Sequence, residues 1–388
     1  MITKKIKSKA KLLTNEINKQ ANKLIKKTTD LIFDNNHDLL TSFPNNDLAK
    51  QNHYPERVMI LKEIITFNQD IKTFVFSPKS PAPLAFFNPG QYVRIYVKND
   101  QICASRDYAL SSSPLEAIEK NIYAITIKRV PNGTVSNFLL DHAKVNDEYR
   151  LSAPTGNFYY SSIRDHQHVV GIAGGSGITP FYSIAKALND GTLNFKLTLF
   201  YGVNTLSEAV FAKELEQLQT KNFKLILVLG KEQNPKYEHG FVSRALVDKY
   251  VSQPYSLFVC GSNGLYAFIF KEFKDFPLKD RRMEPNPMAV RKVCEPKTFN
   301  LTIHVQDEVY NIKANNEETI LMAIEKAGIK APSRCKSGSC GFCRAQLLKG
   351  CVCNCVDKRR YADQDVGAIH VCCVYPDSDL EIKINHNF

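Results

Sequence analysis

The stretch Cys335–Cys355, CKSGSCGFCRAQLLKGCVCNC, contains six of the eleven cysteines of the chain within 21 residues. Cys335, Cys340 and Cys343 have C-x4-C-x2-C spacing, and 28 residues separate Cys343 from Cys372. This spacing is typical of plant-type [2Fe–2S] sites. The serines and glycines between the first three cysteines leave room for backbone amides to approach the sulfurs. We therefore predict that these four cysteines bind a [2Fe–2S] cluster. A zinc site is the alternative, although it normally shows two C-x2-C pairs.

The other nearby cysteines have a different pattern. Cys351, Cys353 and Cys355 alternate, so we expect them to line one face of a strand as small buried hydrophobic side chains. A second metal site is the alternative. Cys373 adjoins Cys372 and is an alternative ligand, but adjacent residues of a strand face opposite sides.

The composition is that of a globular protein of several domains. The 388 residues predict two to four domains, with 44% hydrophobic and 23% charged residues. No apolar run reaches the ~18 residues of a membrane span, and no secretory or transit signal is recognisable. A cytoplasmic location is expected, where clustered thiols usually bind metal or carry out redox chemistry.

The positive charge is concentrated at the N-terminus. Residues 1–30 have nine lysines against Glu16 and Asp30, a net of +7 out of the chain's +12. Residues 1–33 have helical apolar spacing, and 34–54 have the composition of a linker. We expect either a solvated helix packed on the body or a peripheral docking surface for anionic lipid or an acidic protein complex. The charge distribution does not favour nucleic acid as a partner.

Three further regions follow. Residues 55–162 are rich in β-branched and aromatic residues separated by turns, which predicts an antiparallel β-barrel. Residues 163–283 alternate between strands and helices, one helix being expected over 207–219, which predicts a doubly wound α/β domain. The prolines of residues 277–296 indicate a linker, bounded at 284–297. Residues 298–388 predict a small α+β domain that contains the cysteines.

Two glycine-containing stretches in the α/β region indicate a dinucleotide site. GIAGGSGITP (Gly171–Pro180) follows a strand and opens a helix, for which we expect Thr179 as N-cap and Pro180 at N1. Glycines allow close approach to a pyrophosphate, and a helix N-terminus attracts it. The G-x-G-x-x-G spacing is absent, so a packing turn is the alternative. FVCGSNG places Cys260 and Gly261 at the carboxyl edge of the sheet, where ligands bind.

The stretch RDYALSSSP (Arg106–Pro114) combines an arginine, an aromatic residue and several hydroxyls. Such a combination is able to hold a phosphate and cover a planar ring. A loop that simply ends a strand is the alternative.

Together these stretches resemble the ferredoxin–NADP reductase superfamily. The similar subgroup has a C-terminal plant-type ferredoxin domain and includes reductases of ring-hydroxylating oxygenases and of phenylacetyl-CoA oxygenase, and the hybrid-cluster-protein reductase. The resemblance covers roughly residues 55–388. It implies a FAD-binding β-barrel, an NAD(P)-binding α/β domain and a β-grasp ferredoxin domain.

The resemblance also implies roles for particular residues. Arg106 would hold a flavin phosphate, Tyr108 would stack on the isoalloxazine, and Phe158 or Tyr159 near an adenine favours FAD over FMN. Cys260 and Gly261 would lie beside the hydride-transfer carbon, with Thr179 near the nicotinamide. Cys260, Tyr108 and Thr179 are therefore the predicted catalytic residues. The full set of predicted cofactor-binding residues is Arg106, Tyr108, Ala109, Leu110, Lys128, Gly133, Val135, Ser136, Phe158, Gly174, Gly175, Gly177, Thr179 and Gly261.

The sequence departs from the family pattern at three positions. Ala109 replaces a serine or threonine whose hydroxyl would bond flavin N5, and Ser262 follows the Cys-Gly pair where proline is usual. Asn204 stands where many relatives have an arginine, which favours NADH over NADPH. Arg244 is an alternative partner for a 2′-phosphate.

The predicted function is an NAD(P)H:acceptor oxidoreductase that passes electrons from NADH through FAD and [2Fe–2S] to an acidic protein acceptor. The acceptor would be an oxygenase, a hybrid-cluster protein or a small carrier. Arg334, Lys336 and Arg344 surround the cluster ligands and are predicted to raise the potential of the cluster and to dock that acceptor. The alternative is a redox sensor or an electron-transfer subunit, docked through the basic helix and with little turnover of its own.

Overall fold

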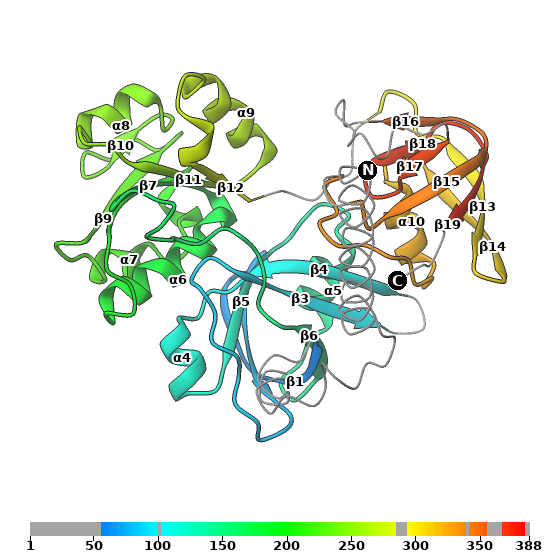
Figure 1. Ribbon diagram of the computed structural model, residues 1–388, viewed down its shortest axis with the longest axis horizontal. Helices are drawn as coiled ribbons and strands as arrows, with labels where there is room; N and C mark the ends of the chain where they lie inside the picture. Colours follow the sequence, from blue (N-terminus) through cyan, green and yellow to red (C-terminus); the bar gives the residue numbers. More distant parts are fainter. Residues whose placement is uncertain (1–55, 99–101, 285–292, 339–340, 355–366, 385–388) are drawn as a thin grey trace, which may run out of the picture. The chain divides into compact units, whose positions relative to one another are not determined.

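The computed structural model describes residues 56–98, 102–284, 293–338, 341–354 and 367–384 (Figure 1). The predicted helix over residues 1–33 lies outside these ranges. Residues 54–388 form one compact unit. None of the helices within the described ranges has both the length and the apolar character needed to cross a membrane.

The first domain is an antiparallel six-stranded sheet with strand order β4-β3-β6-β1-β2-β5. An isolated bridge between Leu110 and Ile125 connects the end of β4 to β5, so the two outer strands meet and the sheet closes into the predicted barrel. Side chains from all six strands fill its core. The elements are β1 (Glu56–Asn68), β2 (Ile71–Pro78), β3 (Tyr92–Lys98), β4 (Cys103–Ala109), α4 (Pro114–Glu119), β5 (Tyr123–Lys128), α5 (Thr134–His142) and β6 (Glu148–Ser152).

The second domain is a parallel six-stranded sheet with strand order β10-β9-β8-β7-β11-β12. Alternate strand residues contribute to two separate hydrophobic clusters, one including α6 and α7 and the other α8 and α9. The helices therefore cover both faces of the sheet, as a doubly wound fold requires. The elements are β7 (His168–Gly174), η1 (Gly175–Gly177), α6 (Ile178–Asn189), β8 (Lys196–Val203), η2 (Leu206–Glu208), α7 (Ala212–Gln217), β9 (Phe223–Leu229), β10 (Glu238–His239), α8 (Arg244–Tyr250), β11 (Ser256–Cys260), α9 (Asn263–Glu272), η3 (Leu278–Asp280) and β12 (Arg281–Met283).

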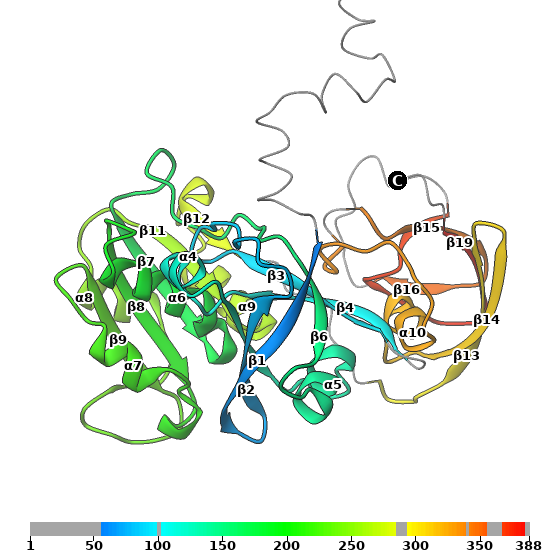
Figure 2. The same cartoon turned by 90° about the horizontal axis from the view of Figure 1, so that it is seen from below.

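The third domain is a five-stranded mixed sheet with strand order β14-β13-β19-β15-β17. Helix α10 packs against this sheet in both views (Figures 1 and 2). β13 and β19 are parallel, whereas the other pairs are antiparallel. The elements are β13 (Thr298–Val305), β14 (Glu308–Asn315), α10 (Ile320–Lys326), β15 (Arg344–Lys349), β16 (Val352–Asn354), β17 (Ala368–His370), β18 (Val374–Pro376) and β19 (Leu380–Ile384).

Three local predictions differ from the structure. Gly177 is the N-cap of α6 and Thr179 lies inside the helix, because the turn η1 runs directly into it. The expected helix over 207–219 is reduced to Ala212–Gln217, since Phe211 has a left-handed backbone (φ 63°) that interrupts a helix. The proline-containing stretch 277–296 begins with ordered structure, since it includes strand β12, which pairs with β11 and lies before the predicted linker bounds of 284–297.

Candidate functional site

A cavity of about 940 Å³ lies where the barrel, the α/β domain and helix α10 meet. Its walls come from the end of β4, the start of α5, the glycine loop after β7 and the carboxyl ends of β8 and β11. Ligands of doubly wound domains bind at this edge of the sheet. Of the predicted cofactor-binding residues, those that line the cavity are Arg106, Tyr108, Lys128, Gly133, Val135, Ser136, Gly174, Gly175 and Gly261.

Helix α5 begins at the wall of this cavity. Its N-cap is Gly133, which has no side chain with which to cap the first turn, and Thr134, Val135 and Ser136 follow. The backbone N–H groups of a first helical turn have no partner within the helix and attract anions. This helix was not predicted from the sequence, but its N-terminus suits a phosphate of a flavin.

Arg106 lies at the junction of this cavity with the third domain. Its Nη1 donates to the Ser105 carbonyl oxygen and to Glu325 Oε2, both at 2.7 Å. A guanidinium has five N–H donors, so these two bonds leave others for a phosphate in the cavity. Arg106 and the start of α5 thus form an anion-binding wall that fits the flavin which the barrel would bind.

Phe158, which with Tyr159 was a candidate for a contact with the adenine, lies in the core and does not line the cavity. Its side chain is buried, with ring centroids 5.6 Å from Phe181 and 5.3 Å from Phe258. These rings belong to the α/β domain, so Phe158 fills the core shared with the barrel. Leu110 is also a core residue, and neither it nor the neighbouring Ala109 lines the cavity.

The glycine loop packs tightly against the Cys-Gly pair. A Cβ on Gly177 would lie 2.1 Å from the Cys260 carbonyl oxygen, so only glycine allows this approach. Thr179 Oγ1 donates to the Ser176 carbonyl oxygen at 3.0 Å, which fixes the loop at the start of α6. Cys260 is buried directly before Gly261, which lines the cavity.

Sequence reasoning missed Glu284, which follows β12. The Cys260 Sγ donates to Glu284 Oε2 at 3.8 Å, and the Tyr266 hydroxyl donates to the Glu284 carbonyl oxygen at 2.8 Å. Burial, with a smaller contribution from Asp107, raises the pKa of Glu284 to about 7. Burial also raises the pKa of the Cys260 thiol. The site therefore places a proton-holding carboxyl beside the predicted hydride-transfer position.

The far end of the cavity contains residues suited to the adenosine part of a dinucleotide. Asn204 Nδ2 donates to Glu208 Oε2 at 3.2 Å, and both residues line the cavity. Phe241 and Phe268 line it as well, with ring centroids 5.7 Å apart. Arg244, the alternative phosphate partner, bonds Asp248 instead and does not line this cavity. Because Glu208 and the two phenylalanines are far apart in sequence, no local motif indicated them.

The structure brings together two of the four predicted cluster ligands. The Cys343 and Cys372 sulfurs are 3.1 Å apart and both side chains are buried. Cys335 is half-buried, and Cys340 lies outside the described residues. Within the described part of the chain, no three metal-ligating side chains form a cluster.

The loop that contains these ligands has an unusual backbone. Lys336, Gly338 and Gly341 have positive φ angles of 53°, 77° and 76°. A loop with left-handed turns directs backbone amides inward, which suits a cluster whose sulfurs accept hydrogen bonds. The buried thiol pair and this loop therefore fit an iron–sulfur cluster.

The other predictions for the cysteines and for the basic residues need correction. Cys351 is exposed and precedes β16, so it is not a buried strand residue, while Cys353 is half-buried and Cys355 lies outside the described ranges. Cys372 and Cys373 lie in a turn where both are buried, so strand alternation does not separate them.

Lys336 is not available to an acceptor protein. It is buried and ion-paired with Glu325, whereas Arg334 and Arg344 are exposed. The predicted docking role is therefore wrong for Lys336 and stays open for the two arginines.

Three family models match consecutive parts of the chain. "Oxidoreductase FAD-binding domain" matches residues 58–160, "Oxidoreductase NAD-binding domain" matches 172–271, and "2Fe-2S iron-sulfur cluster binding domain" matches 303–377. The matches follow the order flavin, nicotinamide and cluster that the motifs indicated.

Similar proteins match most of this chain and nearly all of their own length. A glycine betaine monooxygenase reductase subunit of Chromohalobacter salexigens is 28% identical over 354 residues, covering 83% of this chain and 93% of that protein. The ferredoxin reductase component of 3-ketosteroid-9-alpha-monooxygenase of Mycobacterium tuberculosis is 28% identical over 345 residues, covering 82% and 93%. The solved structure of phthalate dioxygenase reductase has a TM-score of 0.66 at 21% identity, covering 89% of this chain and all of that chain, and it confirms the fold.

The three domains establish the cofactors as FAD, NAD(P)H and a [2Fe–2S] cluster, and the activity as that of an NAD(P)H-dependent reductase that delivers electrons to a protein acceptor. The chain belongs to the ferredoxin–NADP reductase superfamily, in the subgroup that has a C-terminal plant-type [2Fe–2S] domain.

Proposed function

We propose that the chain is an NADH-preferring reductase component whose acceptor is an oxygenase. The observation that carries this proposal is the cavity in which the predicted flavin residues and the glycine loop meet beside the cysteine-containing domain. The printed names of the relatives support the acceptor class, because they are reductase subunits of a glycine betaine monooxygenase, a ketosteroid monooxygenase and a phthalate dioxygenase.

The side of the cavity formed by the barrel, which we call the flavin wall, contains Arg106, Tyr108 and the start of α5, and these have different proposed roles. Arg106 and the N-terminus of α5 would bind the flavin phosphates, and Tyr108 would cover the ring system. When bound, the flavin takes a hydride from the nicotinamide and releases single electrons to the cluster. The protein supplies position, charge and exclusion of water for this chemistry.

The side of the cavity formed by the glycine loop after β7 and the end of β11 would position the nicotinamide, which is the hydride donor. The close contact of Gly177 with Cys260 brings the loop against the end of β11, and Gly261, which lines the cavity there, packs so closely on Leu265 and Gly174 that a side chain would not fit. Glu284 would hold a proton or a negative charge beside Cys260. A negative charge at this point favours departure of hydride, since the nicotinamide ring becomes positive.

The preference for NADH rests on the charge at the adenosine end of the cavity. Glu208 would repel a 2′-phosphate, while its oxygens are acceptors for ribose hydroxyls. The cations that line the cavity in the described part of the chain, Arg106 and Lys128, belong to the barrel. Phe241 and Phe268 would contact the adenine.

A stopped-flow experiment tests the reductase function. Anaerobic mixing of the oxidised protein with NADH should bleach the flavin absorbance within one turnover, and the cluster absorbance should then fall. Slow or absent bleaching by both NADH and NADPH would favour the redox-sensor alternative.

The acceptor is tested separately. A purified oxygenase component should reoxidise the protein, with a rate that falls as salt rises if Arg334 and Arg344 attract an acidic surface. Transfer to small carriers alone, with no transfer to an oxygenase, would contradict the proposed acceptor.

The role of the N-terminal residues is a further part of the proposal. Residues 1–33 would dock the protein on an acidic complex or membrane surface. Deleting them should leave dye reduction by NADH intact and abolish co-sedimentation with anionic vesicles or co-purification with the complex.

A further inference from the structure

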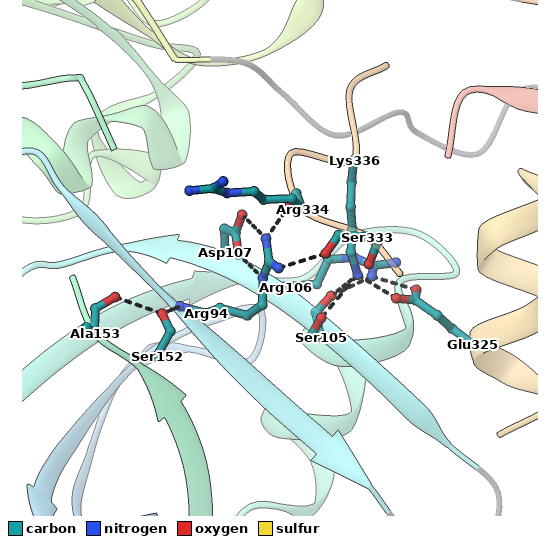
Figure 3. Close-up of polar contacts among 10 residues, drawn as sticks. All are labelled: Arg94, Ser105, Arg106, Asp107, Ser152, Ala153, Glu325, Ser333, Arg334 and Lys336. Carbon is teal, nitrogen blue, oxygen red and sulfur yellow. Dashed lines mark hydrogen bonds and ion pairs between the residues drawn. The ribbon is translucent and has the colours of Figure 1, made fainter. Parts of the chain in front are cut away.

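A group of buried and half-buried charges connects the flavin-binding barrel to the cysteine loop (Figure 3). Glu325 lies on α10 of the third domain, and its residue is only 4% exposed. Lys336, directly after the predicted ligand Cys335, is 6% exposed. Arg106 comes from β4 of the barrel, where it also lines the cavity.

The two carboxylate oxygens of Glu325 bind different cations. Oε2 accepts from Arg106 Nη1 at 2.7 Å, and Oε1 accepts from Lys336 Nζ at 2.5 Å. Lys336 Nζ also donates to the carbonyl oxygen of Ser105, the neighbour of Arg106. Glu325 therefore joins a strand of the barrel and the cysteine loop through charge-assisted hydrogen bonds, which are among the stronger polar contacts in proteins.

A second pair of contacts holds the same loop on its other side. Arg94 of β3 forms an ion pair with Asp107 at 2.7 Å, which orients its guanidinium. Arg94 then donates to the carbonyl oxygens of Ser333 at 2.9 Å and of Arg334. The segment immediately before and after Cys335 is thus bound to two adjacent barrel strands, β3 and β4.

Glu325 is also necessary for electrostatic reasons. Two cations without it would lie close together away from water, and a buried charge that loses its partner is strongly destabilising. Without Glu325, the ammonium group of Lys336 would regain contact with water only by leaving the interface. That movement would carry the cysteine loop away from the barrel.

We propose that Glu325 is a positioning residue for electron transfer, holding the cluster loop against the flavin wall through Lys336 and Arg106. This inference rests on the proposed reductase function and adds a residue to it. Electron transfer between two centres falls steeply with their separation, whereas the hydride transfer from NADH would not depend on where the cysteine loop lies. Loss of Glu325 should therefore affect the two half-reactions differently.

The test is E325Q, measured in two half-reactions by stopped flow. We expect flavin bleaching by NADH to stay within about twofold of the unaltered protein, and the following reduction of the cluster to slow at least tenfold. Flavin and iron content are measured on the same samples, so that loss of a cofactor is not mistaken for loss of position.

A readout that does not depend on activity accompanies the kinetics. Hydrogen exchange of residues 333–338 and of β4 should become faster in E325Q, with β7 and β8 unchanged, because only the contact between the barrel and the loop is lost.

The matched control is E318Q. Glu318 is buried in the same domain and pairs with the exposed Lys326 at 2.5 Å, so the control removes a buried carboxylate whose ion pair stays within one domain. It should change neither the cluster-reduction rate nor exchange in 333–338. If E318Q slows cluster reduction as much as E325Q does, Glu325 has only a folding role and the inference is wrong.

A second variant keeps the test valid if E325Q does not fold. K336M removes the cation from the loop and leaves Glu325 paired with Arg106. It should also slow cluster reduction, by less than E325Q, with flavin bleaching unaltered. Cluster reduction at the unaltered rate in a folded E325Q or K336M protein would overturn the inference, and a failure of NADH to bleach the flavin in the unaltered protein would instead overturn the proposed function.

Discussion

Glu284 is a residue whose part in the site depends on contacts between distant positions. It follows an edge strand, and its side chain reaches Cys260 on the neighbouring strand β11. The sequence around it, RRMEPNP, has prolines and charges typical of a linker, so no local pattern indicated a site residue. Pairing of Arg281–Met283 with β11 is what places the carboxyl beside the thiol.

The first prediction concerns the stability of the Glu284→Gln variant. Burial raises the pKa of Glu284 from 4.5 to about 7, so the folded state holds this proton more tightly than the unfolded state does. The resulting stabilisation is complete below about pH 4.5 and is lost as the pH rises through 7. We expect the variant to gain stability relative to the unaltered protein between pH 5 and 8, by about 1 to 3 kcal/mol. Urea unfolding of the nicotinamide domain at several pH values measures this, and a difference that does not vary with pH would contradict it.

The second prediction concerns the choice of dinucleotide. Replacing Asn204 with Arg and Glu208 with Gln adds one cation and removes one anion where a 2′-phosphate would lie. We expect kcat/KM for NADPH to rise about tenfold, or about 1.4 kcal/mol, with a smaller loss for NADH. Dye reduction with both nucleotides is the assay, and Arg244→Gln is the control that should leave the ratio unchanged, because Arg244 does not line the cavity.

At the scale of elements, the loop between α10 and β15 places the predicted cluster ligands. Its left-handed positions turn the chain so that Cys343 comes within 3.1 Å of Cys372, which is in the turn after β17. His370 of β17 bonds the Gly338 carbonyl oxygen through Nδ1 at 3.1 Å and ties the loop to the sheet. The geometry of the loop thus depends on both glycine and the strand pairing.

The third prediction compares two glycines of this domain. Gly338 in the cysteine loop has φ 77° and Gly328 after α10 has φ 72°, so alanine at either position costs about 1 to 2 kcal/mol in backbone strain. We expect G338A to lose most of its iron, because the loop must change shape near the cluster. G328A, which has no neighbour within 4 Å of its added Cβ, should keep its iron. Iron per chain and the urea midpoint are measured for both, and equal iron contents would contradict the prediction.

Elements with a strong local pattern were predictable from sequence, and those shaped by particular backbone angles were not. The barrel strands and the alternation of the α/β domain follow from side-chain periodicity. α7 is shorter than predicted because the backbone of Phe211 is in the left-handed region. Phenylalanine rarely adopts this conformation, so the sequence did not indicate it. Threonine is a residue type that is common at N-caps, which is why Thr179 was predicted there. The glycine turn before it is already helical, so the helix starts earlier, with Gly177 as its N-cap.

At the scale of the whole molecule, contacts between domains changed the interpretation of several site residues. Lys336 looked like a docking residue for an acidic acceptor because the sequence shows only its charge and its neighbours. The structure pairs it with Glu325 and the barrel backbone, so its charge is used within the molecule. No periodicity in one domain reveals which residues of another domain it will meet.

Phe158 is a second residue whose role is set by the contact between domains. Its ring packs against Phe181 of α6 and Phe258 of β11, and nearby Ser183 Oγ donates to the Ser112 carbonyl oxygen at 2.6 Å. Both contacts cross from the α/β domain to the barrel. Phe158 thus stabilises the relative placement of the two domains that line the cavity, and it does not itself line that cavity.

The fourth prediction tests this packing role. Phe158→Ala should lower the free energy of unfolding by about 3 to 5 kcal/mol, since it leaves a large cavity beside the rings of Phe181 and Phe258. Phe158→Leu fills most of that space and should cost less, so it is the variant for binding measurements. If Phe158 only packs, the leucine variant should change the affinities for FAD and FMN by the same factor, because FMN lacks the adenine. Fluorescence titration of the flavin-free protein measures both affinities. A weakening confined to FAD would show that Phe158 contacts the adenine and that the core position is not its main role.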